Sequence, residues 1–392
     1  MKKIILILLL GIVVKLQAQT TSTHSKEIDT YVQFLETQNT SAKDYILQLF
    51  ENKEIVLLCE RLHPEKTQYD MILEVLKDKR FSDEIGQVFI ETSGRDQEGN
   101  IKKYLNEEMS NQEAEKLLMH ICRNNSLHPV WNYYCFYYFL KEVREINQSL
   151  PNDQKIQIYP SDLSVKWAEL DKESYESEVK SKFPNRDEIM ADYIIKKFDA
   201  IKEGTSKRKK TLVIMNYRHA FSHQFMYPNN EKANNVGRFL MDHYGNKMAN
   251  VFINSFCIDD EKSDSSLEIS NIHDGKWDAA FKVAGKNNIG FSFENNPFGT
   301  DHFDYWKFTP HDFTYANVFD GMVYYHSSSK QEVILGVPHL VDDAFFKELK
   351  RRDLIVNKPR PDKEIWEINT PTNRLDMFYT DSLQMNIDQW LK

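Results

Sequence analysis

Short runs of apolar residues, each followed by polar side chains, recur along this 392-residue chain. The clearest run covers residues 55–59, stops at Glu60 and is followed by His63. A continuous apolar run of this length is typical of a strand that is buried on both faces, as in a parallel sheet. Further runs cover residues 87–90, 155–159, 211–215, 251–257 and 322–325. The pattern predicts one mainly parallel sheet.

The segments between these runs read as helices. Residues 68–79 carry apolar side chains on one helical face, and residues 235–244 form another helical stretch. Two longer helical regions, about 97–150 and 163–207, each follow a strand that ends in polar residues, so we expect them to form a cap over the strand ends. The fold class is therefore α/β: a single mainly parallel sheet flanked by helices, with helical insertions as the cap.

Two segments in this scheme have a distinctive composition. Seven aromatic residues stand between residues 131 and 139, and we expect a buried helix there, with a few of its rings lining a pocket. Residues 259–312 have little periodicity, and we expect them to be rich in loops and to lie near the site.

The polar residues at the strand ends are the candidate functional groups. Glu91 follows the second run, and Arg218 and His219 follow the run at 211–215. Ligands of open α/β sheets bind beyond the carboxyl ends of the strands, so we expect Glu60, His63, Glu91 and His219 to converge there. Arg218 has two interpretations, because an ion pair to one of the glutamates would explain it as well as a catalytic role.

Four further residues enter the set with smaller roles. Asp162 and His326 follow two less regular runs, and each is a further candidate for the same edge of the sheet. Arg61 and Arg186 are expected to act only as supporting partners of the groups that touch the substrate.

The amino terminus has the three parts of a secretory signal peptide: a charged start, an apolar run from Ile4 to Val14, and small residues ending at Ala18. The run is shorter than the roughly 20 residues that span a bilayer. We expect residues 1–18 to be cleaved and residues 19–392 to form one domain in the periplasm or outside the cell, without stable membrane insertion.

The net charge limits the possible partners, and the positions of the cysteines predict whether they are buried or paired. The formal net charge of -9, without a basic face, argues against a nucleic-acid partner. Cys59 and Cys257 read as small buried apolar residues. Cys122 and Cys135 flank a turn-like segment, so a local disulfide is one interpretation of that pair.

These residues resemble the erythromycin esterase-like family, part of a superfamily with the ChaN-like and TraB/Tiki-type proteins. The likeness rests on matches to the family's motifs: Glu60 with His63, Glu91, Trp131 with Arg144 and Asn147, Arg186 with Asp187 and Met190, His219, and a helix at residues 236–240 before Tyr244 and Gly245. The chain departs from the family at Cys59, Pro64, Glu65 and Asn216, and these departures argue against macrolide substrates.

The resemblance implies an exported hydrolase that cleaves an ester or related acyl bond of a small-molecule or peptide substrate. We expect His63 to activate water, Glu60 and Glu91 to orient the imidazole and the water, and His219, helped by Arg218, to stabilise the oxyanion.

Two alternatives use the same residues. In a metal-dependent peptidase, the carboxylates and imidazoles of Glu60, His63, Glu91 and His219 would hold a divalent ion. In a non-enzymatic protein, the crevice would bind haem or another ligand against the aromatic helix. The sequence alone leaves the need for a cofactor open.

Overall fold

The computed structural model describes residues 24–226, 231–259, 268–306, 308–310 and 312–392. The expected signal peptide, residues 1–18, lies outside these ranges. Among the helices that are described, none combines the length and the apolar character needed to cross a membrane.

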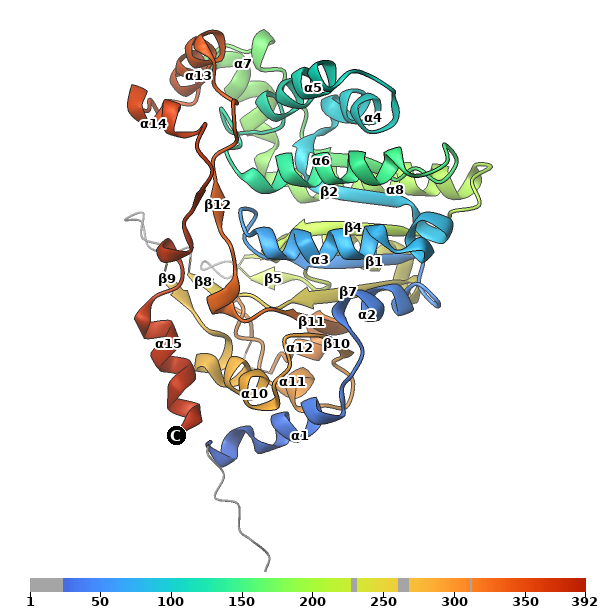
Figure 1. The fold of residues 1–392 in the computed structure, drawn as a ribbon, viewed down its shortest axis with the longest axis vertical. Coiled ribbons are helices and arrows are strands. Elements are labelled where there is room, and N and C mark those ends of the chain that lie inside the picture. Colours follow the sequence, from blue (N-terminus) through green and yellow to red (C-terminus); the bar gives the residue numbers. More distant parts are fainter. Residues whose placement is uncertain (1–23, 227–230, 260–267, 307, 311) are drawn as a thin grey trace, which may run out of the picture.

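A seven-stranded sheet forms the centre of the described structure (Figure 1). Its strand order is β10-β11-β7-β1-β4-β2-β3, and every neighbouring pair is parallel except β10 with β11. This confirms the predicted mainly parallel sheet. The strands are β1 (Ile55–Glu60), β2 (Gln87–Gly94), β3 (Gln157–Asp162), β4 (Thr211–Asn216), β7 (Met248–Ile253), β10 (Asn288–Ser292) and β11 (Gly321–Tyr325).

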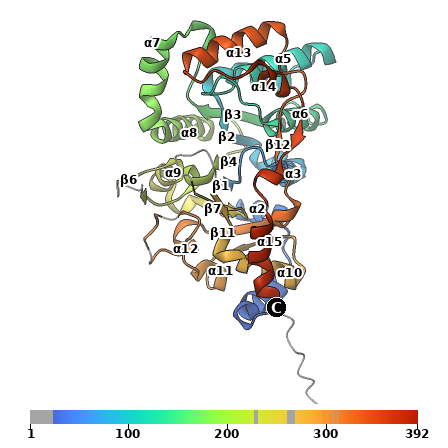
Figure 2. The same cartoon turned by 90° about the vertical axis from the view of Figure 1, so that its left-hand side faces the viewer.

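Helices cover both faces of the sheet, and the direction of the chain decides which face each helix covers. The helices α3 (Lys66–Lys77) and α6 (Tyr134–Gln148) lead from β1 through β2 to β3 and pack on one face. The helices α8 (Arg186–Glu203) and α9 (Val236–Tyr244) lead back through β4 to β7 and pack on the other face, as right-handed crossovers require. Figure 2 shows the sheet between these two layers.

The remaining elements surround this centre. Additional helices are α1 (Asp29–Thr37), α2 (Ala42–Leu49), α4 (Glu98–Asn106), α5 (Asn111–Arg123), α7 (Lys172–Ser174), α10 (Lys276–Ala284), α11 (Pro297–Thr300), α12 (Tyr315–Val318), α13 (Asp343–Ile355), α14 (Asp362–Glu367) and α15 (Asp381–Asp388). Two-stranded pairs are formed by β5 (Phe225–Met226) with β6 (Lys232–Ala233), β8 (Cys257–Asp259) with β9 (Glu268–Ser270), and β12 (Ile334–Leu335) with β13 (Thr372–Asn373).

The central strand β1 shows why the apolar runs are unbroken. Val56 and Leu58 face the layer of α3 and α6, whereas Leu57 and Cys59 face the layer of α8 and α9. Both faces are buried, so neither set of alternating positions tolerates a polar side chain.

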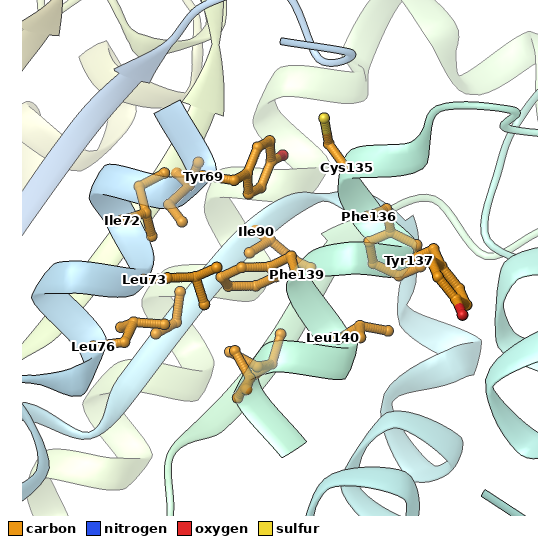
Figure 3. Close-up of a cluster of buried hydrophobic side chains, with 14 of the residues drawn as sticks. Tyr69, Ile72, Leu73, Leu76, Ile90, Cys135, Phe136, Tyr137, Phe139 and Leu140 are labelled. Atoms are coloured by element: carbon orange, nitrogen blue, oxygen red, sulfur yellow. The ribbon is translucent and has the colours of Figure 1, made fainter. Parts of the chain in front are cut away.

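The aromatic segment contributes to the first of these two cores. Phe139 of α6 packs against Tyr69 of α3 with their ring centroids 5.5 Å apart, beside Leu73 and Ile90 (Figure 3). The helix begins at Tyr134, so Trp131 precedes it instead of belonging to it. Burial of most of this helix agrees with the expectation from the sequence.

The structure corrects the expectation for residues 259–312. This region contains the helix α10 and the strand β10, which pairs with β11 at the edge of the sheet. The short strand was hidden by Gly290, where a Cβ atom would lie 2.5 Å from the Cβ of Tyr45. The close packing requires glycine, and a glycine inside a strand weakens the strand signal because it has no side chain to pack.

The two regions expected to form the cap divide their roles. The long helices α6 and α8 flank the sheet. The segment that precedes α6 and the first residue of α8 reach the carboxyl ends of the strands, where His128, Trp131 and Arg186 line a cavity. Cys122 and Cys135 are buried free thiols in the first core, so the local disulfide is not formed.

Candidate functional site

The register of the sheet brings the polar strand ends together. Glu60 is paired with Asn216, and Ile90, which directly precedes Glu91, is paired with Ile214. The pairing of β2 with β3 shifts between Ile90 and Gly94, which marks a β-bulge just beyond Glu91. Bulges next to a site re-aim side chains, and this one shapes the edge of the sheet over β2.

A cavity of about 320 Å³ lies at this edge. Five of the residues predicted from the sequence line it, namely His63, Glu91, Asp162, Arg186 and His219, together with Asn216. Glu60 is buried directly behind His63 and does not line the cavity.

Glu60 holds the first imidazole from behind. The Nδ1 atom of His63 lies 3.0 Å from one carboxylate oxygen of Glu60, and the hydroxyl of Tyr69 donates a hydrogen bond of 2.5 Å to the other oxygen. Burial alone would lower the pKa of His63, but the negative charges of Glu60 and Glu91 outweigh it and raise that pKa above its usual value. His63 is thus a stronger base than a free histidine.

Asp187 holds the second imidazole in the same way. Its Oδ1 atom lies 2.6 Å from Nδ1 of His219, and it also accepts a hydrogen bond of 3.2 Å from the backbone N–H of Val236. Burial raises the pKa of Asp187, but His219 and Arg218 outweigh burial and lower it. The sequence placed Asp187 in a family motif and at a helix start, without assigning it a role in the site.

The two imidazoles meet at Glu91. Its Oε1 atom lies 3.8 Å from Nε2 of His63 and 3.7 Å from Nε2 of His219. The other oxygen of Glu91 accepts a hydrogen bond of 2.9 Å from the backbone N–H of Asn216. Burial of Glu91 raises its pKa, but His219, Arg186 and His63 hold that pKa far below its usual value. The carboxylate is therefore ionised throughout the neutral range.

Arg186 is more central than the sequence suggested. Its guanidinium donates to Glu91 at 2.9 Å and makes two hydrogen bonds to Asp162, of 2.7 and 2.9 Å. One of its Nη atoms lies 3.3 Å from Nε2 of His219. Its side chain, at the start of α8, lines the cavity itself, so Arg186 is placed to contact a ligand as well as to support its neighbours.

Arg218 does not occupy the predicted position. It lies 3.4 Å from Asp187 and stacks over the ring of Phe225, and it does not line the cavity. Arg218 directly precedes His219 in the short 3-10 helix Tyr217–Ala220, so its side chain points in a different direction. Its predicted contact with the oxyanion is therefore not supported.

Arg61 is a structural residue of the core. Its side chain is almost completely buried and donates to Glu65, to Asn254 and to the backbone carbonyl of Tyr325. It ties β1 to the neighbouring strands and leaves no donor for a substrate.

His326 lies in a different cavity, of about 400 Å³, with Asp278 and Tyr324. That cavity is larger, but it contains none of the other predicted groups. The strand β11 is four positions away from β2, which carries Glu91, and neighbouring strands lie about 4.8 Å apart, so His326 cannot reach Glu91.

Aromatic side chains form the wall opposite Glu91. The ring of Trp131 packs edge-on against His63, with centroids 4.8 Å apart, and against Tyr133 at 4.6 Å. The ring of His128 stacks beside Trp131, and burial together with the charge of Arg186 lowers the pKa of His128. A few aromatic residues of this segment thus line a pocket, as expected.

The residues present do not fit a divalent metal ion. The charge of Arg186 touches both Glu91 and His219, so two of the expected ligands already face a cation. Within the described ranges no group of three or more His, Cys, Asp or Glu side chains is arranged to hold a metal. Glu60, also in the expected ligand set, is turned toward Tyr69 and His63.

Comparison with known proteins identifies the fold. No family model and no curated protein matches the chain. A succinoglycan biosynthesis protein of known structure shares 10% identity, with a TM-score of 0.50 over 77% of this chain and 97% of that chain. This likeness shows a common fold.

Two other solved structures are similar to a lesser degree. An erythromycin esterase, EreC, studied as a mutant in its open conformation, has 11% identity and a TM-score of 0.47, and the match covers 78% of this chain and 97% of that chain. A Bacillus cereus protein has 11% identity and a TM-score of 0.45, covering 76% and 97%.

Proposed function

We propose that this protein is a hydrolase that cleaves an ester or related acyl bond of a small-molecule substrate. One observation carries the proposal: two imidazoles, each with Nδ1 within 3.0 Å of a carboxylate oxygen of Glu60 or Asp187, present Nε2 to the same oxygen of Glu91 inside a cavity. A carboxylate that orients a histidine next to a reacting water is the arrangement that general-base hydrolysis needs.

His63 takes the role of the base. With the proton on Nδ1 facing Glu60, Nε2 is free to accept a proton from a water molecule that lies between it and Glu91. The oxygen of that water attacks the carbonyl carbon, and the electrons of the carbonyl double bond move to its oxygen. When the tetrahedral intermediate collapses, the bond to the leaving group breaks and His63 returns the proton to the leaving oxygen.

Arg186 supplies the positive charge beside the developing oxyanion. The guanidinium is fixed by Asp162 and Glu91, so little reorganisation is needed when negative charge appears on the substrate. His219 helps to position it, because its Nε2 lies 3.3 Å from the guanidinium while Asp187 holds Nδ1. In this proposal Arg186, instead of Arg218, helps to stabilise the oxyanion.

A panel of aryl esters, lactones and peptide amides, assayed with and without a chelator, tests the proposal. We expect ester hydrolysis that the chelator leaves unchanged and that the His63→Ala variant loses. Hydrolysis abolished by the chelator would favour the metal-dependent peptidase. Saturable binding of haem or another ligand, without turnover of any compound, would favour the binding protein.

We further propose that the protein acts in the periplasm or outside the cell, on the strength of its N-terminal sequence pattern. Amino-terminal sequencing of the mature protein should begin at Gln19. A membrane-bound protein with an intact Met1 would contradict export by cleavage.

A further inference from the structure

Three side chains in the wall of the cavity have buried polar atoms without a hydrogen-bond partner among the described residues. One such atom is Nδ1 of His63, which lies 3.0 Å from Glu60 outside hydrogen-bond geometry, and the others belong to Ser93 and Asn125. The hydroxyl of Ser93 and both polar atoms of the Asn125 amide are unpartnered, although the two residues are only 2% and 3% exposed. Both residues line the cavity that contains His63 and Glu91. Buried polar groups normally find partners, and unsatisfied ones oppose folding unless a ligand engages them.

The backbone presents Ser93 to the cavity at a conformational cost. Its φ of 92° lies in the region that non-glycine residues avoid, and it falls within the β-bulge between Ile90 and Gly94. A strained backbone of this kind persists where the surroundings impose it, and such positions concentrate at ligand sites. Nothing in the hydrogen bonding of Ser93 itself compensates for the strain.

Asn125 stands on a segment that is fixed from both ends. Arg352 donates to the backbone carbonyls of Arg123 and Pro129, and the indole N–H of Trp167 donates to the carbonyl of Ser126 at 3.0 Å. The segment is therefore rigid around an amide that makes no internal hydrogen bond. A preorganised group of this kind loses little entropy when a ligand binds.

The charge around this pair favours a neutral ligand group. The guanidinium of Arg186 is already matched by Asp162 and Glu91. The lowered pKa of His128 keeps that ring uncharged at neutral pH. Ser93 and Asn125 together offer hydrogen-bond donors and acceptors without net charge, so the complementary group both donates and accepts hydrogen bonds and carries no charge.

We propose that Ser93 and Asn125 form a recognition subsite for an uncharged hydroxyl or carboxamide group of the acyl substrate. The inference rests on the proposed hydrolase function and adds to it the chemical class of the substrate. The subsite binds this polar group while the acyl carbon lies beside His63 and Glu91.

Matched p-nitrophenyl esters test the subsite. Their acyl chains have the same length and end in a hydroxyl, a carboxamide, a methyl or a carboxylate group. In the wild-type protein we expect kcat/KM for the hydroxyl or the carboxamide ester to exceed that for the methyl ester by about tenfold or more, and the carboxylate ester to be the poorest. Comparison of the hydroxyl ester with the carboxamide ester distinguishes a sugar-like substrate from an amide-bearing one.

Variants locate the preference on the two residues. Asn125→Leu keeps the approximate size of the side chain and should remove or reverse the preference for polar esters, and Ser93→Ala should weaken it. Asn287→Leu, in the separate cavity, is the matched control and should leave the preference unchanged. The proposed subsite would be contradicted if the wild-type protein hydrolysed all four esters equally. It would also be contradicted if the preference survived both substitutions.

The Asn125→Leu protein should fold, because the change removes unsatisfied polar atoms, and its Tm should not fall. If it fails to fold, Asn125→Ala and Ser93→Ala carry the test.

Failure of the hydrolase proposal is distinguishable from failure of the subsite. If no ester is cleaved, calorimetry with the four corresponding N-methyl amides tests the subsite by binding alone. Binding of the hydroxyl or carboxamide compound that Asn125→Leu abolishes supports the subsite, whereas equal or absent binding of all four contradicts it.

Discussion

Two histidine–carboxylate pairs face each other across Glu91, and they differ in what their free nitrogens touch. In the pair of His63 and Glu60, Nε2 faces the cavity and lies 3.8 Å from Glu91. In the pair of His219 and Asp187, Nε2 lies 3.3 Å from the guanidinium of Arg186, which takes up its lone pair. The same local chemistry therefore yields a base on one side and a positioning group on the other.

The neighbouring charges reinforce this difference. Two carboxylates raise the pKa of His63, which strengthens it as a proton acceptor. The lone pair of His219 instead accepts a hydrogen bond from a permanently charged arginine, so it is not available to a water molecule. His63 can act as a base for two reasons: its Nε2 does not accept a hydrogen bond from Arg186, as that of His219 does, and Glu60 faces its Nδ1.

The largest effect should follow from removing the first imidazole. His63→Ala should lower kcat by about 100-fold or more, because it removes the imidazole that takes the proton from water. Circular dichroism should show an unchanged fold. His243→Ala is the matched control, since His243 also pairs with an aspartate, Asp199 at 3.1 Å, but on the protein surface. Turnover of the His63→Ala protein at the wild-type rate would remove His63 from the mechanism.

Replacement of Glu91, which lies between the two pairs, should have the second-largest effect on kcat. Glu91→Gln keeps the size of the side chain but removes the charge that orients the water and holds Arg186, so we expect a loss of about 30-fold in kcat with little change in KM.

The effect of Glu91→Gln on the free energy of unfolding should depend on pH. Because folding lowers the pKa of Glu91, its stabilising contribution is complete above the unfolded value of about 4.3 and is lost as the pH falls through the folded value. The difference in free energy of unfolding between wild type and Glu91→Gln should therefore shrink in acid, as measured by urea denaturation. A difference that grows in acid would contradict this account.

The second pair should matter less. Asp187→Asn should lower kcat by about tenfold, because an amide can hold the wrong tautomer of His219 and so displace Arg186. Loss of activity equal to that of His63→Ala would make the two pairs equivalent and contradict the comparison.

The smallest effect should come from Arg218→Ala, with a change in kcat of about threefold or less. Arg218 reaches only Asp187, at 3.4 Å, from a partly exposed position. A loss approaching that of Asp187→Asn in the same assay would restore the direct role that the sequence suggested for Arg218.

The sequence predicted the sheet and the site residues at the strand ends, because both follow from the pattern of apolar runs that end in polar residues. Apolar runs buried on two faces are visible without a structure, and parallel strands necessarily bring Glu60, Glu91 and the residues after β4 to one edge. Arg186 and Asp187 could be named as a helix start and a family motif but not placed, because a sequence does not give the direction of a long side chain beyond a helix terminus.

Local geometry explains the other differences. Tyr217, just before Arg218 and His219, has a positive φ of 47°, and no residue preference of tyrosine indicates it. The same holds for Ser93, whose conformation becomes apparent only from the bulge in β2. Strained positions are where local sequence rules fail, and here two of them lie beside the proposed site.

The dependence of kcat/KM on pH, measured for the wild type and for Glu60→Gln, tests the central claim most directly. Activity should rise with pH through the pKa of His63, which lies above 6.5 in the wild type because of Glu60 and Glu91. Removing the charge of Glu60 leaves only Glu91 to oppose the lowering of that pKa by burial, so the rising limb should move to lower pH. A limb that stays in place in Glu60→Gln would contradict the assignment of His63, held by Glu60, as the base.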